Sequence, residues 1–252
     1  MPLASDGEFS GVFGHKVHMG MNSAAALMVL LFDQGAMRSR FRRIGAILIC
    51  LAGVVLANSA SAVVAIVLAI AIVTVARVAP ALRTAAFALV GLTTLAVSVL
   101  LPYVDIGSIT GLLGRSASLT GRTDFWELAP GYILERPWLG YGYGGFFDRD
   151  PYSQVWDLWS RFQYFFTPNF HNSALDVTIV LGCVGLAAYV AILTTALFIF
   201  RNRSLGRAAE ILGCILILFT ASSATDFQFM RHNCLATILM FYAFMVGGRR
   251  YA

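Results

Sequence analysis

Long runs of apolar residues, separated by short polar stretches, dominate the chain. A helix that crosses a bilayer needs about 20 apolar residues, with a range of roughly 17–25. The second and third runs are short and meet at residues 58–61, which predicts a tight helical hairpin. The pattern predicts an all-α, polytopic membrane fold. The seven expected helical segments cover residues 19–35, 44–58, 61–76, 85–101, 174–200, 209–225 and 234–248.

The composition excludes the other broad classes. Of 252 residues, 58% are hydrophobic and 12% are charged, whereas soluble domains carry about 25% charged residues. Disordered chains are poor in hydrophobic residues. The four cysteines all fall in apolar runs and form no C-x-x-C motif, so neither a zinc site nor a disulfide framework is predicted. No metal or other cofactor is expected.

The charges predict an orientation. Loops that carry many basic residues stay in the cytoplasm. We therefore expect the N-terminus outside, the C-terminus in the cytoplasm and the long loop 102–173 outside. Most of the net charge of +5 then reflects topology and does not indicate a nucleic-acid partner. Eleven of the 18 basic residues lie in the alternate loops assigned to the cytoplasm: Arg38, Arg40, Arg42, Arg43, Arg77, Arg83, Arg201, Arg203, Arg207, Arg249 and Arg250.

The external loop is too long for a simple connector and is rich in aromatic residues. Aromatic side chains favour the membrane interface, and they also form platforms for sugar rings. Thr123 or Asp124 is expected to cap a helix whose apolar face lies in the interface plane. Pro130 is expected to interrupt or kink this helix and Pro137 to end it. The apolar face consists of Phe125, Trp126, Leu128, Ala129, Tyr132 and Ile133.

A glycine-rich segment, GYGYGGF (140–146), follows this helix. It has no strand before it and lies outside the cell, so a dinucleotide site is not predicted. We expect the glycines to let the backbone pack closely against another part of the protein.

Polar residues reappear where the loop re-enters the membrane. Asn172 is the expected N-cap of the fifth segment, with His171 before it and Asp176 one turn later. Arg122 would hold a lipid-linked diphosphate through charge-assisted hydrogen bonds. His171 would deprotonate an acceptor hydroxyl. Together they suit glycosyl transfer from a lipid carrier. Asp226 and its loop, 226–233, are candidates to join this site.

Two motif groups resemble signatures of the O-antigen ligase and polymerase superfamily. The first is GRTDFW (121–126) followed by ERPWLGYGYG (135–144). The second is HNSALD (171–176) followed by LGCVGL (181–186). A third segment, GVFGHKVHMG (11–20), is similar to the exopolysaccharide-polymerase branch.

The resemblance implies a glycosyltransferase-C-like membrane domain over residues 1–252, with 102–173 as its external catalytic loop. It implies a metal-independent inverting glycosyltransferase of the bacterial inner membrane. The donor would be a glycan on undecaprenyl diphosphate. The acceptor would be another glycan or lipid A–core. His171 and Arg122 would be catalytic. Residues expected to bind substrate are His15, Lys16, Asp124, Trp126, Tyr141, Tyr143, Asn172 and Asp176.

The chain departs from the family pattern near its start. Ser10 stands near the position of a usual arginine, and Lys16 would replace that arginine only as a point charge. The family commonly has ten or more spans, so helices are expected to be missing before residue 1. Ligase and polymerase remain open alternatives. A non-catalytic subunit or transporter of polysaccharide export, or an inactive truncated member, also remains open.

Overall fold

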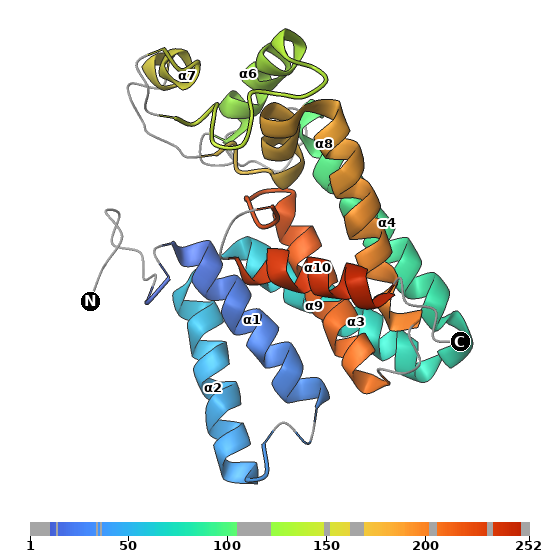
Figure 1. Ribbon diagram of the computed structural model, residues 1–252. Helices are drawn as coiled ribbons and strands as arrows, with labels where there is room; N and C mark the ends of the chain where they lie inside the picture. The colour runs from blue at the N-terminus through green and yellow to red at the C-terminus, as the bar shows by residue number, and fades with distance from the viewer. Residues whose placement is uncertain are drawn as a thin grey trace.

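The computed structural model describes residues 11–13, 15–33, 35, 37–104, 122–148, 152–161, 169–201, 206–230 and 234–247. These residues form helices, and no strand occurs among them. Nine α-helices appear in the described ranges (Figure 1). They are α1 (Lys16–Phe32), α2 (Arg40–Leu56), α3 (Ala60–Val78), α4 (Arg83–Leu100), α6 (Arg122–Glu135), α7 (Val155–Arg161), α8 (Ser173–Leu197), α9 (Arg207–Ser223) and α10 (Leu235–Gly247). Short 3-10 turns follow α3, α4 and α8: η1 (Pro80–Leu82), η2 (Leu101–Tyr103) and η3 (Phe198–Arg201).

Each of the seven apolar segments expected from the sequence coincides with a long helix, which confirms the all-helical prediction. The tight turn predicted between the second and third segments is present, but the two helices do not pack on each other as a hairpin, because α2 packs mainly on α1 and α3 mainly on α9. α2 ends at Leu56, Asn58 adopts a left-handed φ of 44°, and Ser59 precedes α3. Two stretches, Ala85–Tyr103 and Ser173–Leu197, are long and apolar enough to cross a membrane, while α1 and α10 are shorter apolar helices. The full seven-span topology stays a prediction.

α9 forms the centre of the bundle. It contacts α1, α3, α4, α8 and α10, and its residues from Leu212 to Thr220 are buried on all sides. A helix that is apolar all round is expected in such a central position. The outer helices expose large apolar side chains, including Ile49, Val55 and Leu89. Exposed apolar side chains on the outside of a bundle are typical of helices that face lipid.

α6 and α7, the helices of the long loop between α4 and α8, lie over one end of the bundle (Figure 1). Their apolar side chains form a second hydrophobic cluster with the first turns of α8, which contribute Leu175 and Ile179. The apolar face of α6 is therefore largely covered by protein, and the position of α6 in the membrane interface stays a prediction. The buried members of the cluster are Phe125, Trp126, Ala129, Tyr132, Phe146, Val155, Leu158, Trp159, Phe170, Leu175 and Ile179.

Two details of α6 differ from the prediction. The helix begins at Arg122, so Thr123 and Asp124 lie inside its first turn and neither is its N-cap. An acidic residue is favourable there, because the free N–H groups of the first turn carry partial positive charge. α6 also runs through Pro130 to Glu135 without interruption. The helix ends before Pro137, as expected.

α8 is broken at Gly182, where φ is 66° and ψ is −168°. A continuous helix would use the backbone N–H and C=O groups around this position for its own hydrogen bonds. At the break these groups instead form hydrogen bonds with residues 137–142 of the preceding loop. On one side, Tyr141 and Gly142 donate their N–H groups to the carbonyls of Ile179 (3.0 Å) and Val180 (2.8 Å). On the other side, the N–H of Cys183 bonds to the carbonyl of Pro137 at 2.8 Å.

Glycine is required on both sides of this contact. A Cβ at Gly140, whose φ is 63°, would overlap the carbonyl oxygen of Ile179, and a Cβ at Gly182 would overlap the carbonyl of Trp138. The prediction that the loop glycines permit close backbone packing is confirmed at Gly140. The packing partner is the broken helix that follows His171.

Candidate functional site

The start of α8 is fixed by hydrogen bonds to the bundle. Asn172 is fully buried and accepts a bond from the N–H of Leu175 at 3.0 Å, which confirms it as the N-cap. Its amide nitrogen donates to the carbonyls of Ser98 in α4 (2.9 Å) and Ala224 after α9 (3.0 Å). Because both amide hydrogens are used by the protein, the geometry supports a positioning role for Asn172 more than direct substrate binding.

The loop after α9 is attached to the same point. The hydroxyl oxygen of Ser173 accepts bonds from the N–H groups of Gln228 (2.8 Å) and Phe229 (3.2 Å). Gln228 is itself buried and its side-chain amide donates to a carboxylate oxygen of Asp226 at 3.2 Å. The start of α8 and the loop after α9 therefore form one hydrogen-bonded unit.

His171 lies at the edge of this unit. Its backbone has a left-handed φ of 55°, and its N–H donates to the side-chain oxygen of Asn169 at 2.9 Å. Its Nδ1 lies 3.5 Å from Oδ1 of Asp226, and the side chains of His171 and Asp226 are 19% and 6% exposed. This distance allows electrostatic attraction between a charged imidazole and the carboxylate. Nδ1 itself has no hydrogen-bond partner among the described residues.

α6 is joined to the residue before His171. The indole nitrogen of Trp126 donates to the carbonyl of Phe170 at 2.8 Å, and both residues are buried. Arg122 begins the helix one turn before Trp126, about 6 Å along the axis at 1.5 Å per residue. The indole bond thus connects α6, one turn after Arg122, to the residue before His171. The side chains of Arg122 and Asp124 lie outside the described residues.

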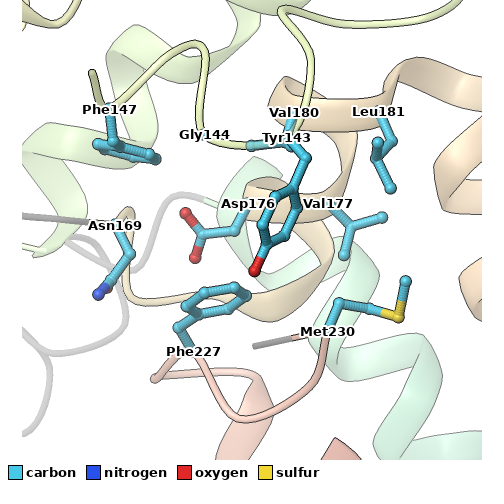
Figure 2. Close-up of a pocket in the computed structure, with 10 residues that line it drawn as sticks. All are labelled: Tyr143, Gly144, Phe147, Asn169, Asp176, Val177, Val180, Leu181, Phe227 and Met230. Atoms are coloured by element: carbon cyan, nitrogen blue, oxygen red, sulfur yellow. The ribbon is translucent and has the colours of Figure 1, made fainter. Parts of the chain in front are cut away.

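A pocket of about 280 Å³ lies beside this region. Its walls come from the glycine-rich segment, the first turns of α8 and the loop after α9 (Figure 2). Asp176 is 2% exposed, and its Oδ1 accepts a bond from the N–H of Phe170 at 2.8 Å. Its Oδ2 has no hydrogen-bond partner among the described residues. The lining residues are Tyr143, Gly144, Phe147, Asn169, Asp176, Val177, Val180, Leu181, Phe227 and Met230.

The comparisons with known proteins fit this arrangement. The family model described as "O-Antigen ligase" matches residues 45–190, which is more than half of the chain. The chain belongs to the O-antigen ligase family. This is a family of membrane proteins of surface-polysaccharide biosynthesis. The matched range contains the external loop, His171 and the break in α8, whereas α1 and Asp226 lie outside it.

One curated relative is similar over part of its length. The chain is 29% identical over 92 residues to the exopolysaccharide production protein ExoQ of Rhizobium meliloti (strain 1021). The aligned region is 36% of this chain and 21% of the relative, so the match spans about a fifth of the relative's length. No solved structure matches the chain.

The two tyrosines of the family's first signature have different surroundings. Tyr141 is partly buried, donates its hydroxyl to Glu135 at 2.6 Å, and lies under the guanidinium of Arg136, which is 4.9 Å from the ring centroid. Burial, followed by the bond to Glu135, raises the pKa of Tyr141 above its ordinary value. Tyr143 is 66% exposed and lines the pocket. Tyr143 is therefore better placed than Tyr141 to meet a ligand.

His15 and Lys16, the predicted substrate-binding residues of the third motif, lie at the start of α1. The side chain of His15 caps the helix by accepting from the N–H of Val17 at 3.3 Å. α1 packs mainly against α2, α9 and α3, and it begins apart from α6 in Figure 1. The structure does not bring these two residues together with the start of α6.

Several pocket residues were not predicted as part of the site. Asn169, Phe227 and Met230 line it, and Asp226 was only a candidate to join it. The PNFHN segment (168–172) indicates a capped helix start but gives no sign that a loop 55 residues later will reach it. In the described part of the chain, no three His, Cys, Asp or Glu side chains converge in a way that would hold a metal ion.

Proposed function

We propose that the chain transfers a glycan from undecaprenyl diphosphate to an acceptor hydroxyl at the outer face of the bacterial inner membrane, in surface-polysaccharide synthesis. One observation carries the proposal. The two family signatures, far apart in sequence, interlock through the backbone bonds between residues 137–142 and the break in α8, and through the bond from Trp126 to Phe170. We propose that this interlock holds Arg122 and His171 in one region beside the pocket.

The proposed reaction is an inverting displacement that needs no metal. Nε2 of His171 takes the proton from the acceptor hydroxyl, and the hydroxyl oxygen forms a bond to the anomeric carbon of the donor. The bond from that carbon to the diphosphate oxygen breaks, and the diphosphate leaves with the electron pair. Arg122 stabilises the charge that develops on this leaving group.

Asp226 acts as a positioning residue in this proposal. With its carboxylate 3.5 Å from Nδ1 of His171, it favours the tautomer that carries the proton on Nδ1. It also stabilises the imidazolium that forms when Nε2 takes a proton. In other enzymes a carboxylate that hydrogen-bonds to a catalytic histidine supports base catalysis.

The proposed topology places the N-terminus outside and the C-terminus in the cytoplasm. It is supported by two observations. The basic loops alternate along the chain, and α6 and α7 lie together over one end of the bundle. The lipid bilayer, a lipid-linked glycan donor and an acceptor glycan or lipid A–core are the proposed partners.

The test is complementation of a deletion strain with full-length tagged variants. His171→Ala and Arg122→Ala are expected to abolish surface glycan and to cause lipid-linked glycan to accumulate. With purified protein, His171→Ala should slow transfer by roughly 10²–10⁴-fold, the usual contribution of a general base. Arg42→Ala is the matched control, because Arg42 is an exposed arginine in the first turn of α2. Membrane levels are measured by immunoblot. Normal glycan in the His171→Ala, Arg122→Ala double variant at wild-type protein level would refute the proposal.

A further inference from the structure

The unpartnered oxygen in the pocket indicates what kind of ligand fits. Asp176 is nearly fully buried, and its Oδ2 has no hydrogen-bond partner among the described residues. Figure 2 shows this carboxyl group facing the space between Tyr143, Asn169 and Phe227. A buried polar atom without a partner is unfavourable. A ligand that brings a hydrogen-bonding group to Oδ2 removes this penalty, whereas a lipid chain does not.

The remaining walls favour a compact ring with an apolar face. Tyr143, Phe147 and Phe227 supply aromatic rings, and Val177 and Val180 supply aliphatic surface. A pyranose has C–H groups on its faces, which pack on aromatic rings, and hydroxyl groups around its edge, which reach a carboxyl group. Pockets that bind small molecules combine such apolar walls with a few convergent polar groups.

Size and charge narrow the ligand further. The volume of about 280 Å³ is near the lower end of the range for small-molecule pockets, roughly 300–1,000 Å³. It has room for one sugar ring inside the pocket. The described lining residues include the carboxyl of Asp176 and no cationic side chain. A diphosphate or an acidic sugar would therefore bury its charge there without a cationic partner, which is unfavourable.

The pocket also adjoins the proposed base. Asn169, which lines the pocket, accepts the N–H of His171 at 2.9 Å. Phe227, which also lines the pocket, directly follows Asp226, whose carboxylate lies 3.5 Å from the imidazole. A sugar in the pocket would lie beside the group that takes the proton of the acceptor.

We propose that this pocket binds one neutral pyranose, the terminal sugar of the acceptor, through a hydroxyl bond to Oδ2 of Asp176 and stacking on Tyr143 or Phe227. The assignment of this sugar to the acceptor rests on the proposed function. The binding of a neutral sugar rests only on the pocket itself.

The binding test uses saturation-transfer NMR on the full chain in lipid nanodiscs free of glycoside detergents. The probes are glucose, galactose, mannose, N-acetylglucosamine and glucuronate, each added alone. At least one neutral sugar is expected to receive saturation, and glucuronate at least threefold less than glucose. Val180→Trp, which fills the pocket, should reduce the neutral-sugar signal at least fivefold. Val184→Trp is the matched control, because Val184 is one turn further along α8, 55% exposed and not part of the lining.

A neutral-sugar signal that Val180→Trp leaves unchanged would overturn the proposal. So would a Val180→Trp-sensitive signal from farnesol alone, which would assign the pocket to a lipid chain.

Surface glycan in cells distinguishes this inference from the proposed function. His171→Ala should lose the glycan yet keep the neutral-sugar signal, whereas Val180→Trp should lose both. If the sugar binds but His171→Ala makes normal glycan, the proposed function fails and the sugar subsite stands without its acceptor role. If His171→Ala loses the glycan and no sugar binds, the subsite is wrong and the proposed function stands.

Discussion

Gly140 and Gly142 offer a test of how the loop is held on the broken helix. Both have a positive φ, 63° at Gly140 and 90° at Gly142, but only at Gly140 would a Cβ overlap backbone atoms of α8. An alanine at either position carries the strain of a left-handed backbone, about 1–2 kcal/mol. Gly140→Ala must in addition push the loop away from α8, because backbone atoms cannot move aside as a side-chain end does.

The size of this extra effect follows from the hydrogen bonds at the contact. Four backbone bonds join residues 137–142 to residues 179–184, and each contributes about 0.5–1.5 kcal/mol net. Losing them lowers the free energy of local opening by at least about 2 kcal/mol relative to Gly142→Ala. Hydrogen exchange of the Tyr141 and Gly142 amides should then be about 30-fold faster in Gly140→Ala than in Gly142→Ala, since 1.4 kcal/mol corresponds to a factor of ten.

The measurement is hydrogen exchange with mass spectrometry on the protein in nanodiscs, with peptides that cover 137–145 and 179–186. Gly131→Ala is a further control, because a Cβ at this helical position meets no atom within 4 Å, and it should leave exchange in both peptides unchanged. Equal exchange in Gly140→Ala and Gly142→Ala would refute the argument that contact with α8 holds the loop.

Three further predictions concern single contacts. Asn172→Ala should lower the free energy of unfolding in detergent by about 2–4 kcal/mol. It removes the N-cap of α8 and leaves the carbonyls of Ser98 and Ala224 without their hydrogen-bond donor. A loss below about 0.5 kcal/mol would contradict this reasoning. Trp126→Phe should cost about 1–2 kcal/mol in the same assay through the lost bond to Phe170, while Trp138→Phe, at an exposed tryptophan, should cost little. Since the pKa of Tyr141 is raised, the protonated phenol is favoured in the folded state, and any stability from this shift is lost only as pH rises above about 10. The difference between the ultraviolet absorbance titrations of the wild type and of Tyr141→Phe should show no ionisation of Tyr141 below that pH.

The helices were predictable because apolar length and polar breaks directly determine where a helix can lie in a bilayer. The N-cap at Asn172 was predictable for a similar local reason, since an Asn before an apolar run satisfies free N–H groups at the helix start. The close packing of the glycine-rich segment was predictable from its composition. Each of these signals is contained within a few consecutive residues.

The long-range contacts were not predictable in the same way. The apolar face of α6 correctly indicates burial, but amphipathicity does not distinguish a lipid interface from a protein cluster. The break at Gly182 depends on residues 137–142, which arrive from about 40 positions earlier. The pairing of His171 with Asp226 joins segments on either side of α8 and α9. A single sequence carries no local sign of such pairings.

The break at Gly182 also determines where the junction of a chimera between this protein and a relative can be placed. Leu175 and Ile179 complete the hydrophobic cluster of the external loop, so the first turns of α8 belong to that loop as much as to the bundle. A chimera joined at residue 173 would separate these side chains from the cluster and divide the backbone pairs at the break between two parents. A junction placed after Val184 keeps both partners of every such pair from one parent, so loop exchanges that probe sugar specificity should carry about the first half of α8 with them.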